Sequence, residues 1–369
     1  MKILVLMAGA RAGAEFFQSL LDGHKQILQL PGILHVNGEL IKILSIKSKK
    51  KLAEEFVKKY IYYFDSRKSN IERHNMLGLK KKSSYKVNKN FFIKRFIQIS
   101  KKKKRFKNEL FQNLYLIHLA YNSKLKERNI KTFVINAHII PYVINFNSYF
   151  KDIKFEIIHT IRNPLASISS TLKNWTRYKN GFFFTPKELY YNLKLIFFGI
   201  DEMIKLNKKI YIIQLENLHQ KSEKVFKKFC KIYKISFSNR FKNSTFHNLK
   251  WWGDKISRNN KSGINKKHKV NYDTNYFTKY DLAFFQNKYN IKLKNYCYGV
   301  ISEQSQNLHL SPLKCEFLTW KNTIKNRRFK HIISIPYFYF KRLILFTFYH
   351  YKNTNLPASI GLDKDKIIK

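Results

Sequence analysis

Acidic residues and cysteine are both scarce in this chain. Its 369 residues include 23 Asp and Glu against 72 Lys and Arg, which gives a formal net charge of +49. This excess favours anionic partners such as nucleic acid, anionic lipid or acidic substrates, without distinguishing among them. The three cysteines, Cys230, Cys297 and Cys315, have neither metal-site nor redox spacing. The sequence therefore predicts no metal site and favours a reducing, cytoplasmic compartment.

The sequence also lacks an apolar run long enough to span a membrane. The aromatic stretch 332–351 is interrupted by Lys341 and Arg342, below the roughly 18 apolar residues that a membrane span needs. We expect this tail to lie on an anionic membrane surface, at the inner face, without crossing it. The apolar stretch at the N-terminus is too short for a secretory leader and predicts a first strand instead.

Strand patterns alternate with helix patterns over most of the chain. Apolar runs typical of buried strands occur at 3–8, 132–137, 155–161 and 210–215, with a short one at 26–30. Helical patterns lie between them, at 15–21, 108–128, 167–175, 186–206 and 223–233. The alternation predicts an α/β fold with a central parallel sheet covered by helices on both faces. We assign this domain to 1–300, with a Lys-rich helical insertion at about 42–107, and regard 301–369 as a C-terminal appendage.

The first expected strand ends in a loop of small residues that leads directly into a helix pattern. The loop consists of Gly9, Ala10, Arg11, Ala12, Gly13 and Ala14. Such a turn leaves backbone N–H groups at the positive end of the helix dipole, which favours an anionic group. The loop lacks the Lys and hydroxyl residue of a G-x-x-x-x-G-K-[ST] sequence, and with them a Mg²⁺ ligand. This argues against a kinase or NTPase.

A second motif follows the expected strand 155–161. That strand ends in Arg162-Asn163-Pro164, and Ser170 lies on the helix pattern that comes next. Ligands of parallel sheets bind beyond the carboxyl ends of the strands. We therefore expect the loops that carry Arg11 and Arg162 to meet at one nucleotide that has phosphates at two places.

Three motifs together resemble those of a known family, the sulfotransferases. The segment 9–15 looks like their 5′-phosphosulfate loop, G-x-P-R-S-G-T-T, and Arg162 to Ser170 is similar to their 3′-phosphate motif, R-[DN]-P-x-x-x-x-x-S. The segment 214–218, Gln-Leu-Glu-Asn-Leu, is similar to their Y-E-D-L strand end. The resemblance covers about 1–233 and implies a P-loop-like three-layer sandwich. It also implies metal-independent transfer of a sulfuryl group from 3′-phosphoadenosine 5′-phosphosulfate to a hydroxyl of a sugar, glycan or lipid-linked acceptor.

The resemblance also implies roles for individual residues. Arg11 and the backbone of the 9–14 loop would hold the 5′ end of the donor, and Arg162 with Ser170 would hold its 3′-phosphate. A late loop that includes Trp251, Trp252, Lys255 and Arg258 would close over the adenine and the 3′-phosphate. Ala12, Ala14 and Glu15 replace the hydroxyl residues of the family's loop. Contacts to the 5′-phosphate would then come from backbone amides and from Arg11.

The base that accepts the proton of the acceptor hydroxyl has more than one candidate. Ala137-His138-Ile139-Ile140-Pro141 resembles the K-T-H-x-P segment that supplies a catalytic His in the cytosolic branch of the family. Glu39 follows Arg11 at a spacing similar to that of the catalytic Glu in the glycan-modifying branch. His35 is a third choice. We favour His138 and keep Glu39 as its rival.

Two other classes of function remain open from the sequence. A basic nucleic-acid-binding protein would fit the charge, but no zinc-finger spacing or RNP-type motif is present, so we expect no specific nucleic-acid partner. A nucleotide-dependent kinase with a degenerate phosphate loop is the enzyme alternative.

Overall fold

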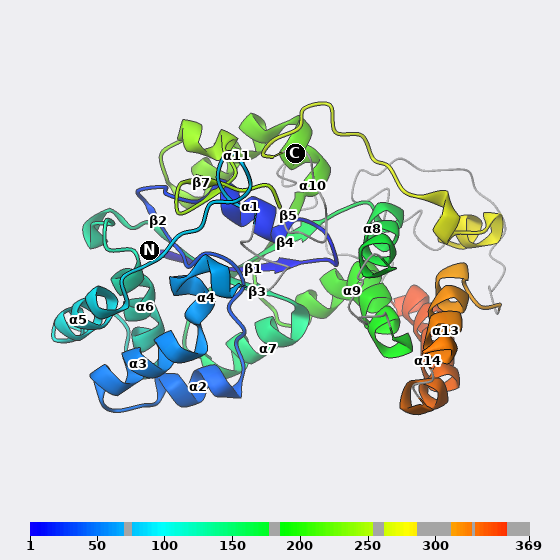
Figure 1. Cartoon of the computed structure of the whole chain (residues 1–369), viewed down its shortest axis with the longest axis horizontal. Helices are drawn as coiled ribbons and strands as arrows, with labels where there is room; N and C mark the ends of the chain where they lie inside the picture. Colours follow the sequence, from blue (N-terminus) through cyan, green and yellow to red (C-terminus); the bar gives the residue numbers. More distant parts are fainter. Residues whose placement is uncertain (70–75, 177–184, 254–261, 286–310, 327–328, 353–369) are drawn as a thin grey trace.

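A five-stranded parallel sheet forms the centre of the computed structural model, which describes residues 1–69, 76–176, 185–253, 262–285, 311–326 and 329–352 (Figure 1). The strands are β1 (Lys2–Ala8), β2 (Ile27–Leu28), β3 (Thr132–His138), β4 (Glu156–Ile161) and β5 (Ile210–Gln214). They lie in the order β2-β3-β1-β4-β5, and every pair is parallel. The α/β fold with a central parallel sheet, predicted from the alternation of apolar runs, is confirmed.

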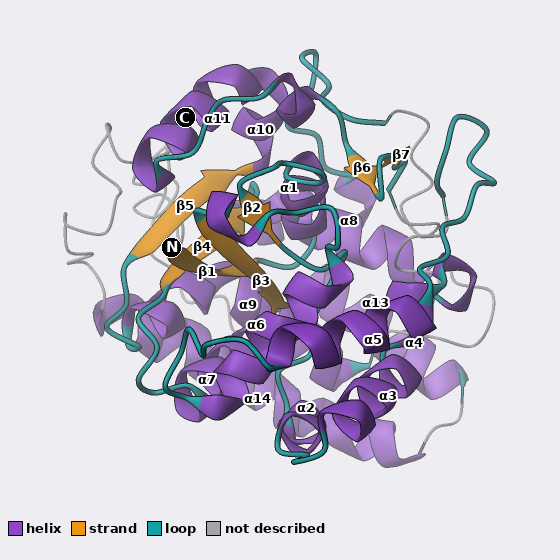
Figure 2. Ribbon diagram, turned by 90° about the vertical axis from the view of Figure 1, so that its left-hand side faces the viewer, coloured by secondary structure: helices purple, strands orange, loops and turns teal. Residues whose placement is uncertain are grey.

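Both faces of the sheet are covered by helices (Figure 2). Successive residues of a strand point to opposite faces, and Val5 and Leu6 of β1 accordingly belong to different core clusters. The cluster of Leu6 includes residues of α1 (Ala14–Leu20), α10 (Leu215–Gln220) and α11 (Ser222–Tyr233). The cluster of Val5 includes residues of α2 (Gly38–Leu44), α6 (Glu109–Tyr121), α7 (Ile140–Tyr149) and α9 (Pro186–Ile204). Burial on both faces explains why apolar residues predominate in the strands, with a few buried polar residues such as Asn136 and His159 among them.

The Lys-rich segment 42–107 is helical over much of its length. It contains α3 (Lys49–Lys59), α4 (Ile61–Phe64), a 3-10 turn η1 (Ser66–Lys68) and α5 (Lys89–Ser100). The side chains of Ser48 and Asn88 accept backbone N–H groups at the starts of α3 and α5, which stabilises the first turn of each helix. Phe56 and Phe92 are buried in the same cluster as Val5. The segment therefore extends the core on one side of the sheet.

The helix expected over 108–128 is shorter in the structure, because α6 ends at Tyr121. The Asn122 side chain donates to the carbonyl oxygens of His118 and Gln29, at 2.8 Å each. These bonds tie the end of α6 to Gln29, which follows β2, and the chain continues into a 3-10 turn, η2 (Glu127–Asn129). The remaining elements are α8 (Pro164–Thr176), η3 (Asn239–Lys242), β6 (Thr245–Phe246), β7 (Leu249–Lys250) and η4 (Thr274–Tyr276).

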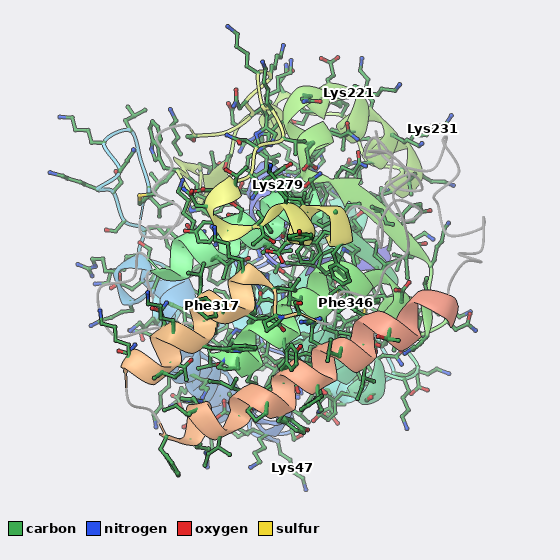
Figure 3. All side chains as sticks on the ribbon, turned by 90° about the vertical axis from the view of Figure 1, so that its right-hand side faces the viewer. Lys47, Lys221, Lys231, Lys279, Phe317 and Phe346 are labelled. Atoms are coloured by element: carbon green, nitrogen blue, oxygen red, sulfur yellow. The ribbon has the colours of Figure 1, made fainter. Side chains whose placement is uncertain are left out.

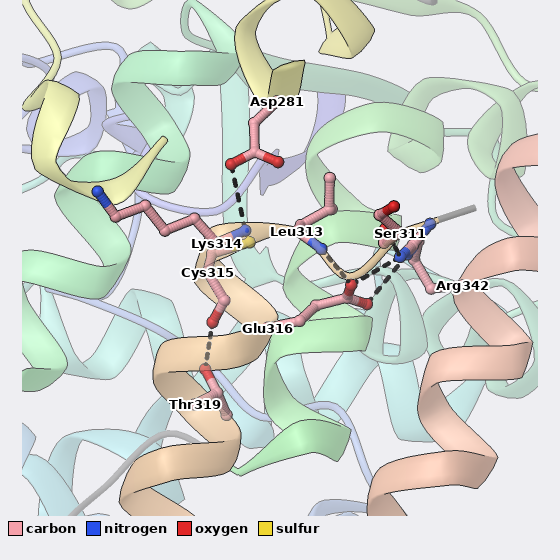
Figure 4. A network of polar contacts seen from close by, with 8 residues as sticks. All are labelled: Asp281, Ser311, Leu313, Lys314, Cys315, Glu316, Thr319 and Arg342. Carbon is pink, nitrogen blue, oxygen red and sulfur yellow. Dashed lines mark hydrogen bonds and ion pairs between the residues drawn. The ribbon is translucent and has the colours of Figure 1, made fainter. Parts of the chain in front are cut away.

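The C-terminal tail folds back onto the body as two helices, α13 (Lys314–Lys325) and α14 (Phe329–Lys352). Phe346 of α14 contacts Phe197 and Phe198 of α9, each edge-on at a centroid distance of 5.5 Å. Arg342 of α14 and Glu316 of α13 form a buried ion pair, with Nη2 and Oε2 2.7 Å apart (Figure 4). Within the described residues, no helix has the length and apolarity needed to cross a bilayer.

Candidate functional site

A cavity of about 970 Å³ opens at the carboxyl ends of the parallel strands. Residues that follow four of the strands line it: Arg11 after β1, His138 at the end of β3, Arg162 after β4 and Leu215 after β5. Parallel sheets bind their ligands at this edge, and the volume suits a nucleotide-sized molecule. Arg11 and Arg162, on loops far apart in the sequence, thus share one cavity.

The loop after β1 is held in a turn that requires glycine at one position. The Gly9 N–H donates to the Thr160 carbonyl oxygen of β4, and the Ala12 N–H donates to the Gly9 carbonyl oxygen, at 3.0 Å each. Gly13 has φ +82°, and a Cβ there would lie 2.5 Å from Leu215 Cδ1. The backbone angle therefore favours glycine, and a Cβ would in addition require the Leu215 side chain to shift. Arg11 has φ 55°, a conformation that non-glycine residues rarely adopt outside functional sites and tight turns.

The loop after β4 is tied to both of the other motifs. The Asn163 N–H donates to Glu216 Oε1 at 2.9 Å, and Asn163 Oδ1 accepts the Ala166 N–H at the start of α8. The Ser167 hydroxyl donates to the Ala10 carbonyl oxygen in the first loop. Together with the contact between Leu215 and Gly13, these bonds join all three motifs at the floor of the cavity.

Arg162 lies near two imidazole rings that the sequence analysis did not identify. The rings of His219 and His268 are 4.7 Å apart between centroids, and both residues line the cavity. Burial, His268 and the Arg162 cation lower the pKa of His219 to about 4. Burial and Arg162 also lower the pKa of His268, against an opposing effect of Glu216. At neutral pH both imidazoles are therefore neutral hydrogen-bonding groups, and Arg162 supplies the positive charge.

The charged residues of the cavity wall favour an anionic ligand. Its described lining includes the cations Arg11, Arg162 and Lys173 and the acids Glu15 and Asp273. Three cations against two carboxylates give the cavity wall a net positive charge. The positive net charge of the whole chain adds to the electrostatic potential there. Among the described residues, no His, Cys, Asp and Glu side chains are grouped as metal ligands.

Two tryptophans form another part of the wall. Trp251 is buried, packs edge-on against Phe246 at 5.2 Å, and its carbonyl oxygen accepts the Ser262 hydroxyl. The Nζ atoms of Lys250 and Lys81 lie 4.1 Å and 4.7 Å from the ring centre of Trp252. Both tryptophans line the cavity, as does Gly253. Lys255 and Arg258, which the sequence analysis assigned to the same loop, lie outside the described residues.

Sulfotransferase domains are among the solved structures similar to this chain. The sulfotransferase domain from the Synechococcus PCC 7002 olefin synthase shares 13% identity, covers 66% of this chain and 77% of its own, and gives a TM-score of 0.33. The sulfotransferase domain from the curacin biosynthetic pathway shares 13% identity, covers 73% of this chain and 86% of its own, and gives a TM-score of 0.34. No family model matches the sequence. A search of curated proteins also finds no match.

One of the three candidate bases lines the cavity. His138 is the one that does so. It lies at a β-bulge where the register between β3 and β1 shifts, and its own φ is 67°. Glu39 is on the exposed side of α2, 2.7 Å from Lys59 Nζ, and this hydrogen bond lowers the pKa of the carboxyl. His35 stacks on Tyr142 at 5.0 Å. Neither Glu39 nor His35 is part of the cavity lining, so the structure does not bring these two sequence-based candidates to the site.

Most of the other predicted binding residues line the cavity. Ala10, Ala12, Gly13, Ala14 and Ser170 line it, whereas Gly9 lies just behind them and fixes the loop to β4. His219 was missed although it follows the recognised segment 214–218 by one position. His268, in contrast, has no neighbouring motif, so only the three-dimensional structure reveals it.

Proposed function

We propose that this protein is a sulfotransferase that uses 3′-phosphoadenosine 5′-phosphosulfate as its donor. The observation that carries the proposal is the shared cavity of Arg11 and Arg162, each at the end of a parallel strand. The donor has anionic groups at its 5′ and 3′ positions, and the two arginines match that pattern. The order of the three motifs and the sulfotransferase domains among the structural neighbours are consistent with this proposal.

In the proposed complex the two loops bind opposite ends of the donor. Arg11 and the backbone of the 9–14 loop contact the 5′-phosphosulfate, and Arg162 with Ser170 contacts the 3′-phosphate. A guanidinium group presents paired N–H donors to phosphate oxygens, which a lysine ammonium group does not. Trp251 and Trp252 offer aromatic surfaces to the adenine.

The reaction we propose is an in-line transfer. The acceptor hydroxyl oxygen forms a bond to sulfur while the bond from sulfur to the 5′-phosphate oxygen breaks, and that oxygen keeps the electron pair. His138 takes the proton of the hydroxyl, and Arg11 stabilises the charge on the leaving phosphate. Because the protein mainly aligns the groups and neutralises charge, the chain's own residues suffice without a metal.

The acceptor class is a hydroxyl of a sugar, a glycan or a lipid-linked molecule. Beyond the donor loops, the cavity is lined by the amides of Asn174 and Asn192 and by the aliphatic side chains of Ile33, Ile139 and Leu195. Amides bind hydroxyl groups, and aliphatic side chains pack against sugar rings or alkyl chains.

Ligand preference tests the donor assignment directly. In calorimetric titrations of the full chain, 3′-phosphoadenosine 5′-phosphate should bind at least about tenfold more tightly than adenosine 5′-phosphate, because its second phosphate meets Arg162. Adenosine 2′,5′-bisphosphate is the matched control, since it has the same groups with one phosphate displaced, and it should bind more weakly. Equal or tighter binding of Mg-ADP or Mg-ATP would instead support a kinase.

If His138 is the base, replacing it should lower kcat and leave the affinity for 3′-phosphoadenosine 5′-phosphate nearly unchanged. His138→Asn, chosen because Asn tolerates a positive φ, should lower kcat by about 100-fold or more once an accepted hydroxyl compound is supplied. Affinity for 3′-phosphoadenosine 5′-phosphate should stay within about twofold, since His138 is assigned to the acceptor and not to the donor. Glu39→Gln serves as the control and should leave both quantities unchanged. The opposite pattern would make Glu39 the base.

A further inference from the structure

The outer sides of α13 and α14 carry a row of exposed apolar side chains, which we call the apolar row. Its members on α14 are Phe329, Ile333, Tyr337, Phe340 and Ile344, and α13 adds Phe317 and Ile324. Each is between 54% and 74% exposed. Spacings of three and four residues place side chains on one side of a helix. Figure 3 looks onto this surface, with the two helices running across the front of the molecule.

The opposite sides of the two helices hold them on the protein body. Phe338, Leu345 and Phe346 of α14 are buried, and α13 buries Cys315 and Thr319. The guanidinium of Arg342 donates to both carboxylate oxygens of Glu316 and to the Ser311 carbonyl oxygen (Figure 4). The apolar row is therefore displayed by a packed, hydrogen-bonded pair of helices.

Among the described residues of α13 and α14, the exposed charges are positive. No Asp or Glu occurs anywhere in α14, and the single acid of α13, Glu316, is buried and paired with Arg342. Lys321, Lys325 and Lys330 are exposed beside the row. A second copy of this chain would bring the same positive charges face to face, which disfavours it as the molecule that covers the row. An anionic surface with an apolar interior complements both features.

We propose that α13 and α14 dock the protein on an anionic lipid surface. The apolar row enters the boundary between headgroups and acyl chains, with the helices lying in the plane of the membrane, and the flanking lysines contact the headgroups. This surface is separate from the cavity and does not depend on the donor assignment.

Vesicle co-sedimentation of the full chain tests the proposal. The vesicles are phosphatidylcholine with or without phosphatidylglycerol, and two triple variants of equal net charge are compared. The first removes the apolar row: Ile333→Ser, Phe340→Ser and Ile344→Ser. The second removes exposed apolar side chains elsewhere: Leu79→Ser, Phe91→Ser and Ile144→Ser. We expect the first to lower partitioning onto anionic vesicles at least about tenfold and the second to change it less than about twofold.

Three results would overturn the proposal. Equal binding of both triple variants would mean that bulk charge alone attracts the chain. Equal binding of the natural chain to neutral and anionic vesicles would show that the lysines do not contribute to binding. A lipid-free dimer that the first variant converts to monomer, seen by light scattering, would identify a second copy as the molecule that covers the row. The thermal unfolding midpoints of the variants should match that of the natural chain. A loss of vesicle binding then cannot be caused by unfolding of the variant.

Discussion

Arg162→Ala is expected to weaken binding of 3′-phosphoadenosine 5′-phosphate by roughly 100-fold, about 2.7 kcal/mol. The arginine lies beyond the end of β4 in the cavity, and its charge is close enough to lower the pKa of both His219 and His268. Removing Arg162 takes away the cation whose charge acts on both imidazoles. A lost pair of charge-assisted hydrogen bonds accounts for an effect of this size. Titration calorimetry of the full chain is the measurement.

Two further variants separate a specific contact from bulk charge. Arg162→Lys keeps the charge but loses the planar pair of donors, so its affinity should fall between those of the natural chain and Arg162→Ala. Lys231→Ala removes one exposed charge from α11, away from the cavity lining, and should leave affinity unchanged. If Lys231→Ala weakened binding as much as Arg162→Ala, the ligand would be held by the general field of this basic protein.

Arg342→Met is expected to destabilise the packing of α13 and α14 by about 3–5 kcal/mol. The side chains of Arg342 and Glu316 are 1% and 6% exposed, and their ion pair joins the two helices. Methionine fills much of the same volume but leaves a carboxylate buried without its partner. Urea unfolding followed by tryptophan fluorescence reports the change, because Trp320 of α13 packs against Tyr339 of α14 at 5.6 Å.

The double variant Arg342→Met, Glu316→Leu distinguishes an unpaired charge from lost packing. Removing both charges together should recover part of the stability, since no buried charge is left without a partner, while the Leu313 N–H loses its Glu316 acceptor. Lys341→Met is the control, because it replaces another cation by methionine one position earlier, where the side chain is partly exposed, and it should change the unfolding midpoint little. If the double variant were as unstable as Arg342→Met, the loss of stability would come from the missing packing of the arginine side chain and not from an unpaired charge.

The main strands were predictable because of where they are buried. A parallel strand covered on both faces is rich in apolar residues, and β1, β3, β4 and β5 all appear in the sequence as short, mainly apolar segments. β2 has only two residues and was expected to be longer. At the end of α6, Asn122 donates a hydrogen bond to Gln29, a residue far away in the sequence. Such long-range bonds have no local signature.

The candidate site was predictable where its residues follow strand ends. Arg11, His138 and Arg162 each stand directly after an apolar run, and parallel strands bring those positions to one edge. Glu39 was chosen by spacing alone. Its helix begins at the Asn37 cap and holds the carboxylate beside Lys59, outside the cavity lining. His268 and Ser262 come from irregular chain after β7, where neither periodicity nor a motif indicates which residues will face inward.

The hydrogen bonds from Ser167 to Ala10 and from Gly9 to Thr160 link the loop after β1 to β4 and to the start of α8. They hold the backbone of the loop that carries Arg11 in a fixed position relative to β4 and α8, which flank the loop that carries Arg162. In the proposed complex, a ligand whose two anionic groups match the distance between the arginines therefore contacts both without having to order the loops. A shorter or longer ligand would contact only one of them.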